Sequence, residues 1–115
     1  MSVVDARTHE AVQTITLSGE MMRPMGVVVS PDGSRLYVST GRGKQLAIID
    51  TATHAQVGSV EVGERPWGLD ISRDGTLVFT ANGPSNDVTI VDTATMSVVG
   101  RVQAGERPWG VVFVP

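Results

Sequence analysis

Three arginines and two tryptophans recur at equivalent positions of one short motif. The motif reads Gly-Glu-Arg-Pro-Trp-Gly at residues 63–68 and again at 105–110, and a weaker form, Met-Arg-Pro-Met-Gly, spans residues 22–26. Guanidinium groups bind carboxylates and phosphates through paired hydrogen bonds, and indole rings offer stacking and cation–π surfaces. The motif therefore favours a site for a small anionic ligand or a partner protein. Its candidate residues are Arg23, Arg65, Arg107, Trp67 and Trp109.

Two other polar residues are candidates for the same site. Asp70 stands where the equivalent positions hold Val28 and Val112, on a strand expected to line a central channel, and its carboxylate could bind a cation or a polar ligand. Because a carboxylate buried alone is costly, the alternative for Asp70 is contact with channel water. Asn82 begins a Gly-rich loop expected on the same face as the arginines.

A purely structural interpretation of the motif stays open beside the binding one. In it, Pro and Gly set the turn, each Trp is a wedge between neighbouring repeats, and each Arg pairs with the adjacent Glu64 or Glu106. The two interpretations differ in whether the guanidinium groups are engaged in ion pairs.

The elements that must position these residues form a repeat. The step from Pro24 to Pro66, and again to Pro108, is about 42 residues, which lies in the size range of propeller blades. Each unit contains four short strands, A to D, separated by turn signals such as Asp-Gly and Asp-Thr-Ala-Thr. The strands are expected at 25–30, 35–40, 45–50 and 56–62 in the first unit, and at 67–72, 77–81, 87–92 and 98–104 in the second.

The ends of the chain carry parts of further units. Residues 3–5 and 11–17 match strands C and D, and residues 109–114 match a lone strand A. We therefore predict an all-β fold of propeller blades, each of four antiparallel strands, with about two and three-quarter blades in the chain. The expected parts are strands C and D in 1–23, blades at 24–65 and 66–107, and a closing strand A at 108–115.

The strand order predicts which loops share a face. In an A-B-C-D meander, the D-to-A links and the B-to-C loops lie at one end of the strands, and the A-to-B and C-to-D turns lie at the other. The Arg-Pro-Trp motifs are D-to-A links, and the Gly-rich segments 41–44 and 82–86 are B-to-C loops, so we expect them together beside the channel. His9 and His54 share a C-to-D turn position on the opposite face, where exposed turn residues are expected.

The repeats resemble the YVTN β-propeller repeat family. The resemblance covers nearly the whole chain and rests on Ser30–Gly33, on Leu36–Thr40, and on Asp50–Thr53 with its copy at 92–95. That family includes bacterial periplasmic propellers and archaeal surface-layer repeats, so the resemblance implies a periplasmic or extracellular location, although no signal-peptide pattern opens the chain. Family propellers have more blades in one chain than this sequence supplies.

Composition narrows the possible partners. The net charge is −3, and no basic run appears, which disfavours nucleic acid and a membrane surface as partners. The chain has no cysteine, so thiolate chemistry and disulfides are excluded. No nucleophile elbow or zinc-binding helix motif occurs, and no metal or cofactor is expected.

These observations predict a non-catalytic propeller module that binds through its Arg/Trp-bearing face. Two alternatives remain: a fragment of a propeller enzyme, of the lactonase type or associated with quinoproteins, and a structural surface-layer repeat in which Arg65 and Arg107 form salt bridges. Because an open arc of blades leaves apolar faces in water, we expect the chains to associate into a closed ring, with a dimer favoured over a trimer. The alternative is that the missing blades belong to a longer parent chain.

Overall fold

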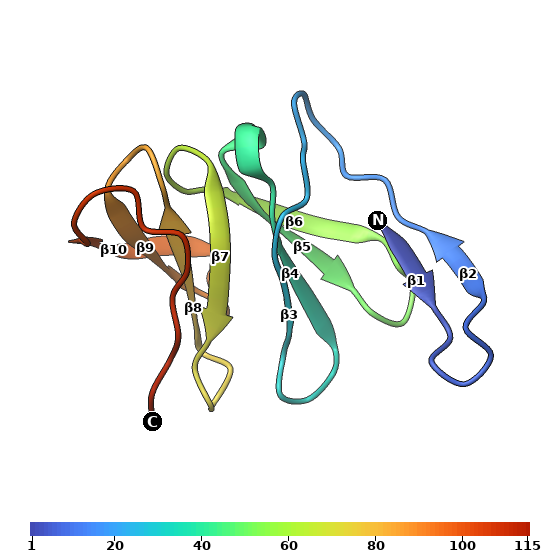
Figure 1. The fold of residues 1–115 in the computed structure, drawn as a ribbon. Coiled ribbons are helices and arrows are strands. Elements are labelled where there is room, and N and C mark those ends of the chain that lie inside the picture. The colour runs from blue at the N-terminus through green and yellow to red at the C-terminus, as the bar shows by residue number, and fades with distance from the viewer.

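Ten strands form three antiparallel sheets in the computed structural model, which describes residues 1–115 and measures 42 × 31 × 24 Å (Figure 1). The N-terminal hairpin comprises β1 (Ser2–Val4) and β2 (Ala11–Thr14). Blade 1 comprises β3 (Val27–Val29), β4 (Arg35–Ser39), β5 (Gln45–Asp50) and β6 (Gln56–Glu61), with the 3₁₀ helix η1 (Gly41–Gly43) between β4 and β5. Blade 2 comprises β7 (Pro66–Ile71), β8 (Leu77–Asn82), β9 (Asp87–Asp92) and β10 (Ser97–Gln103). No helix is long and apolar enough to cross a membrane.

The two complete sheets confirm the predicted blades. In each, the strands pair in sequence order, β3-β4-β5-β6 and β7-β8-β9-β10. The register also repeats. The pairing of β5 with β6 shifts between Ile48 and Ile49, and the pairing of β9 with β10 shifts at the equivalent residues, Ile90 and Val91. The 42-residue repeat of the sequence is thus a repeat of blade geometry.

The C-to-D turns explain why histidine recurs at one position of the repeat. His9, His54 and their counterpart Met96 all have left-handed backbones, with φ of 59°, 60° and 52°. Histidine is among the residues enriched in this region. The turn is closed by the preceding aspartate: Asp50 Oδ1 accepts the backbone N–H groups of Ala52 and Thr53 at 2.8 and 3.0 Å. Both histidines therefore occupy turn positions, away from the arginine motifs.

The A-to-B hairpins depend on the same kind of local bond. Asp32 Oδ1 accepts hydrogen bonds from the Ser30 hydroxyl at 2.6 Å and from the Ser34 backbone at 2.9 Å. Asp74 repeats this arrangement in blade 2. The next residue in each turn is Gly33 or Gly75, with φ of 76° and 75°, a conformation that glycine adopts without a steric penalty.

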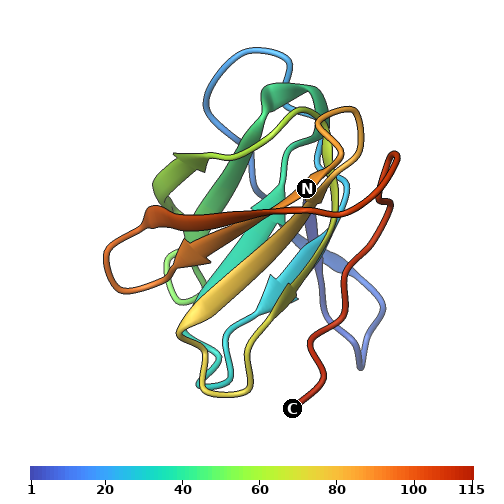
Figure 2. The same ribbon diagram turned by 90° about the vertical axis from the view of Figure 1, so that its left-hand side faces the viewer.

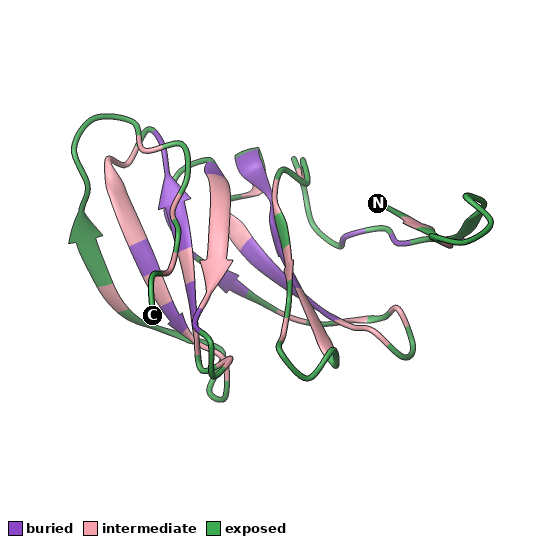
Figure 3. Ribbon diagram, turned by 60° about the horizontal axis from the view of Figure 1, so that its bottom comes forward, coloured by how far each residue is buried: buried purple, intermediate pink, exposed green.

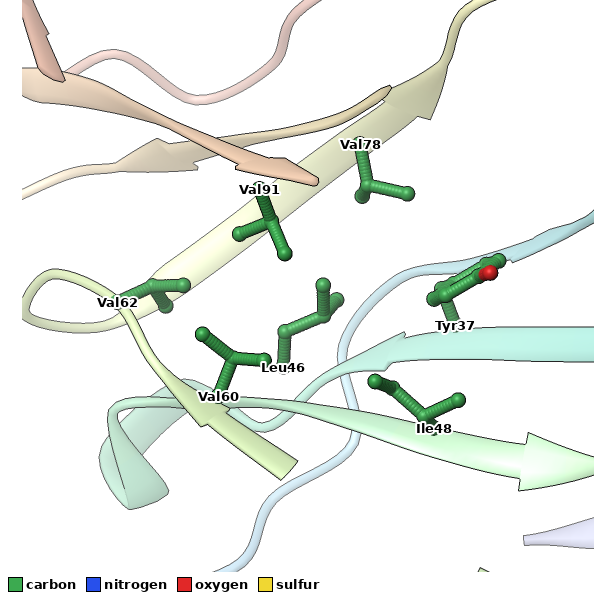
Figure 4. Packing of buried hydrophobic residues seen from close by; sticks show 7 residues of the cluster. All are labelled: Tyr37, Leu46, Ile48, Val60, Val62, Val78 and Val91. Atoms are coloured by element: carbon green, nitrogen blue, oxygen red, sulfur yellow. The ribbon is translucent and has the colours of Figure 1, made fainter. Parts of the chain in front are cut away.

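The main core is the seam between the two blades. Tyr37, Leu46 and Ile48 of blade 1 point toward Val78 and Val91 of blade 2 (Figure 4). A second, smaller cluster joins the N-terminal hairpin to blade 1, where Ile15 and Leu17 pack against other apolar residues of β4 and β5. The core is therefore built from contacts between neighbouring sheets, as expected for stacked blades.

The C-terminal segment departs from the prediction. Residues 109–114 were expected to form a strand A, and the structure has no strand there; the segment runs beside β7 (Figures 1 and 2). Its contacts with β7 include a bond from the Gly68 N–H to the Trp109 carbonyl at 3.1 Å and one from the Phe113 N–H to Asp70 at 2.8 Å. A regular strand needs a paired neighbour along its length, and no strand of residues 1–115 pairs with the segment in a ladder.

The turn aspartates predict a specific loss of stability in acid. Hydrogen bonds from the Ser72 hydroxyl and from Thr76 lower the pKa of Asp74 from 3.8 to about 2, and bonds from Ser30 and Ser34 do the same for Asp32. A carboxyl with a lower pKa in the folded state stabilises the protein fully above its unfolded pKa, and that contribution is lost as the pH falls toward the folded value.

We therefore expect the melting temperature to fall as the pH is lowered from about 5 to about 2, and to fall less in the Asp32→Asn, Asp74→Asn double variant. Thermal melts followed by circular dichroism across this range measure the difference. Equal pH dependence in the two proteins would contradict the assignment.

Candidate functional site

Two of the predicted arginines line one hollow at the edge of the blades. The basic hollow lies at the seam, is open to solvent and has a volume of about 200 Å³. Its lining residues are Arg23, Met25, Gly41, Arg42, Arg65 and Trp67. Arg23 and Arg65 reach it from successive D-to-A links, and Arg42 reaches it from η1. The prediction that D-to-A links and B-to-C loops share a face therefore agrees with the arrangement of the hollow.

The guanidinium groups of the basic hollow have no acidic partner. Arg23, Arg42 and Arg65 are exposed, and none of them forms a salt bridge in the structure. Glu64, which neighbours Arg65 in sequence, instead lies 3.4 Å from the Lys44 ammonium group. Arg107 likewise forms no salt bridge, so the ion pairs expected from a purely structural motif are not formed.

A second hollow occurs twice, once beside each blade, with a different charge each time. Beside blade 1 it is lined by Met21, Arg42, Lys44, Glu64 and Arg65. Beside blade 2 it is lined by Pro84, Asn86, Glu106 and Arg107, which occupy repeat-equivalent positions. Proline and asparagine thus replace the two basic B-to-C loop residues. The first hollow is positive, whereas a single Arg and a single Glu balance each other in the second.

Tryptophan 67 forms one wall of the basic hollow and is held on two sides. Its ring stacks on that of Trp109, with centroids 4.3 Å apart and an interplanar angle of 28°. On its own blade it covers Gly83 so closely that the indole leaves no room for a Cβ there. Trp109 is 72% exposed. Trp67 therefore packs between its own B-to-C loop and the following segment, and Trp109 presents an open ring.

The structure gives Asp70 a partner within the chain. One carboxylate oxygen, Oδ2, accepts the backbone N–H of Phe113 at 2.8 Å, and the other, Oδ1, accepts the N–H of Ile71 at 2.8 Å. The carboxylate is partly buried between β7 and the C-terminal segment. Asp70 does not line the basic hollow, and its position ties the segment to blade 2.

Asn82 differs from the other candidate residues because its side chain is buried and does not line the hollow. Its side chain is fully buried at the end of β8. The amide nitrogen donates to Asp87 and to the Thr89 hydroxyl, both at 2.7 Å, and the amide oxygen accepts from Thr80 at 3.1 Å. All its polar groups are thus satisfied inside blade 2, away from the hollow.

The sequence reasoning missed Arg42 as a site residue. Arg42 lies in the Gly-Arg-Gly-Lys segment 41–44, which was predicted only as a Gly-rich B-to-C loop. The useful signal was the position of this loop in the blade, since B-to-C loops were already expected beside the arginine motifs. The structure brings Arg42 to the same hollow as Arg23 and Arg65.

Comparison with known proteins identifies the family of this chain. A family described as "Cytochrome D1 heme domain" matches residues 1–109, almost the whole chain. The chain belongs to the cytochrome D1 heme domain family. This is a β-propeller-type domain, in agreement with the fold. No curated protein matches the sequence.

Solved structures similar to this member of the cytochrome D1 heme domain family share its blade arrangement. Hydrazine synthase of Kuenenia stuttgartiensis is 26% identical, with a TM-score of 0.77 over 86% of this chain and 28% of that one. A functionally unknown protein from Desulfotomaculum acetoxidans DSM 771 is 16% identical, with a TM-score of 0.79 over 96% of this chain and 37% of that one. U3-55K is 13% identical, with a TM-score of 0.70 over 80% of this chain and 30% of that one. The chain thus spans about a third of the length of these proteins.

The family description raises the question of whether these residues fit a haem. Haem iron is commonly held by histidine, cysteine or tyrosine, or by methionine together with histidine. His9 and His54 lie in the C-to-D turns, whereas the basic hollow is lined by D-to-A links and by the B-to-C loop that contains η1. Figure 1 shows the β1–β2 and β5–β6 turns at the opposite end of the strands from η1. Met25 is the ligand-type residue that lines the hollow. The residues of this chain therefore do not fit an iron site at the hollow, although its guanidinium groups suit the carboxylates of an anionic ligand.

The different packing of the two tryptophans predicts different costs of removal. Trp67→Ala deletes a ring packed on Gly83 and on Trp109, and we expect it to lower the free energy of unfolding by about 2–3 kcal/mol, somewhat less than for a fully buried Trp. Trp109→Ala removes mainly the stacked pair, worth about 1 kcal/mol. Urea denaturation measures both, with the remaining tryptophan as the fluorescent reporter. Equal costs for the two variants would contradict this assignment.

Proposed function

We propose that this chain is a non-catalytic β-propeller module that binds a small anionic ligand in the basic hollow. The observation that carries the proposal is the convergence of Arg23, Arg42 and Arg65 on one hollow without an acidic partner for any of them. Three like charges placed together repel one another, and a bound anion relieves that repulsion. The Trp67 ring on the same wall provides an apolar or stacking surface for the rest of the ligand.

The geometry favours a ligand with more than one acidic group. A guanidinium group presents a planar fork of donors that matches a carboxylate or phosphate, and the arginines come from three separate segments of the chain. A hollow of about 200 Å³ suits a compact molecule better than a macromolecular surface. Di- and tricarboxylates and pyrophosphate share the required chemistry.

The proposal also covers where the module is located and the larger propeller to which it belongs. The repeats resemble the YVTN family, which supports a periplasmic or extracellular location, and the family match supports a place within a propeller. Arg107 continues the line of arginines at the next repeat. Within a complete propeller, the basic hollow would hold the acidic side of a ligand bound near the channel.

Binding can be measured with pyrophosphate and citrate as probes, by calorimetry and by the fluorescence of the two tryptophans. A hydrogen bond to a charged group contributes about 1.5–3 kcal/mol, so Arg65→Ala should weaken binding roughly tenfold or more. The Arg23→Ala, Arg65→Ala double variant should abolish it. Arg65→Lys keeps the charge and loses the planar fork, so we expect an intermediate affinity.

Arg73→Ala is the matched control, because Arg73 is an exposed arginine in the A-to-B turn at the other end of blade 2. It should bind both probes with unchanged affinity. The melting temperatures of all variants should stay close to that of the wild type, since none of the three substituted side chains forms a salt bridge. Absence of binding to either probe, or equal losses in Arg65→Ala and Arg73→Ala, would overturn the proposal.

A further inference from the structure

A polar hollow at the A-to-B end of the seam has no part in the proposed anion binding. It is open to solvent, has a volume of about 230 Å³ and lies between blades 1 and 2, both of which are complete. The basic hollow lies at the other end of the strands, beside η1 (Figure 1). The lining of this second site, the acidic hollow, includes Asp32, Arg35, Tyr37, Asp74, Gly75 and Thr93.

The two A-to-B turns at the rim of the acidic hollow are in contact. Pro31 of blade 1 lies so close to Gly75 of blade 2 that a Cβ on Gly75 would be 2.9 Å from the proline ring. The turns lie side by side at one end of the strands (Figures 1 and 2) and are largely exposed (Figure 3). Asp32 follows Pro31 and Asp74 precedes Gly75, so this contact brings two carboxylates from neighbouring blades to one hollow.

Each of these carboxylates has one oxygen engaged and one oxygen free. Oδ1 of Asp32 and Oδ1 of Asp74 accept the hydrogen bonds of their own turns, and neither Oδ2 takes part in a hydrogen bond or a salt bridge in the structure. The bonds from serine hydroxyls and turn backbone lower the pKa of both carboxyls to about 2, so both are ionised at neutral pH. The cation of the hollow, Arg35, is paired with Asp50 at 2.7 Å. The acidic hollow is therefore negative.

Tyr37 supplies a third oxygen without a partner. Its side chain is 4% exposed, and its hydroxyl is turned away from Leu46 in the core (Figure 4). No hydrogen bond of this hydroxyl is formed, since the nearby Thr93 hydroxyl donates to the Gly75 carbonyl at 2.7 Å. No unpartnered side-chain oxygen or nitrogen is sealed from solvent, so the Tyr37 hydroxyl must open into the hollow that Tyr37 lines. Phe79 holds the equivalent position in blade 2, so packing does not account for the hydroxyl.

We propose that the acidic hollow binds a primary ammonium group. An ammonium group has three N–H donors and no acceptor. The hollow offers three oxygens without partners, which are Oδ2 of Asp32, Oδ2 of Asp74 and the hydroxyl of Tyr37. Hydrogen bonds between ionised groups are the strong ones, and a cation between the two carboxylates removes their mutual repulsion. The phenol proton then turns to the Thr93 oxygen, whose own proton is donated to Gly75.

A calcium ion matches the acidic hollow less well than an ammonium group. Calcium takes about six to eight oxygen ligands, and no group of three His, Cys, Asp or Glu side chains in the chain could hold a metal ion. The ammonium group of a small amine and that of a lysine side chain on a partner protein share the required chemistry. Neither depends on the basic hollow, so this inference does not rest on the proposed function.

NMR titration of the full chain with butylamine and with a lysine capped at both ends tests the proposal. Tyr37 is the only tyrosine, so its ring signals report on the hollow without overlap, and we expect them to shift with both amines and not with butanol. Tighter binding of the capped lysine would indicate a protein partner, whereas equal binding would indicate a free amine. Calcium chloride in place of the amines should leave the signals unchanged.

Variants of the three oxygens separate binding from stability. Tyr37→Phe should weaken amine binding about threefold to tenfold, as for one neutral hydrogen bond, and Asp74→Asn about tenfold or more, as for a charged one. Asn keeps an acceptor oxygen for the turn bonds, and Asp32→Asn is the second variant of this kind. Glu61→Gln is the control, because Glu61 is an exposed carboxylate at the end of β6 and lies outside the hollow.

Affinity for pyrophosphate should be the same in all these variants, since the basic hollow is intact in each. Circular dichroism checks that each variant is folded. Absence of Tyr37 shifts with both amines would overturn the proposal. So would equal losses in Asp74→Asn and Glu61→Gln, or calcium ions that shift the Tyr37 signals at lower concentration than the amines.

Discussion

The packed seam between neighbouring blades is the interaction on which the rest of the structure depends. Leu46 and Ile48 of blade 1 and Val78 and Val91 of blade 2 are each at most 1% exposed. Full burial of such a side chain contributes about 1.5–3 kcal/mol, whereas a typical hydrogen bond contributes about 1 kcal/mol net. A blade in isolation would leave these residues in water, so the fold is stable because its sheets stack.

The repeated motif serves the seam and the candidate site with different residues. The Trp-Gly part meets the following repeat: the Trp67 ring stacks on Trp109, and Gly68 admits the backbone of residue 109. Arg65 precedes it with a left-handed backbone, φ of 47°, and Arg107 repeats this conformation with φ of 48°. A left-handed non-glycine residue costs on the order of 1 kcal/mol. In the first copy, Arg65 is exposed while Pro66 after it is buried and Trp67 is partly buried.

The blades could be predicted from the sequence because their determinants are local. Turn aspartates such as Asp50 bind backbone groups two and three residues away. A few consecutive residues are therefore enough to predict each turn. The positions of Asp70 and Asn82 could not be predicted in this way. The partner of Asp70 is Phe113, 43 residues along the chain, and the burial of Asn82 depends on how β8 and β9 pair. The C-terminal segment was misjudged because a strand needs a partner that its own residues do not reveal.

The basic hollow exists only where the two blades stack, because its lining residues come from both sides of the seam. Any function of the hollow therefore depends on the stacking of the blades. Arg23 and Arg42 come from blade 1 or its entering link, Arg65 comes from the link between the two blades, and Trp67 comes from β7 of blade 2. No single repeat contains the set, so a ligand that contacts all of them must bridge two repeats. The repeat-equivalent hollow beside blade 2 has lost two of its basic residues to Pro84 and Asn86. The backbone frame thus repeats because the seam requires it, while the charges of the B-to-C loop, which the seam does not use, differ between the two blades.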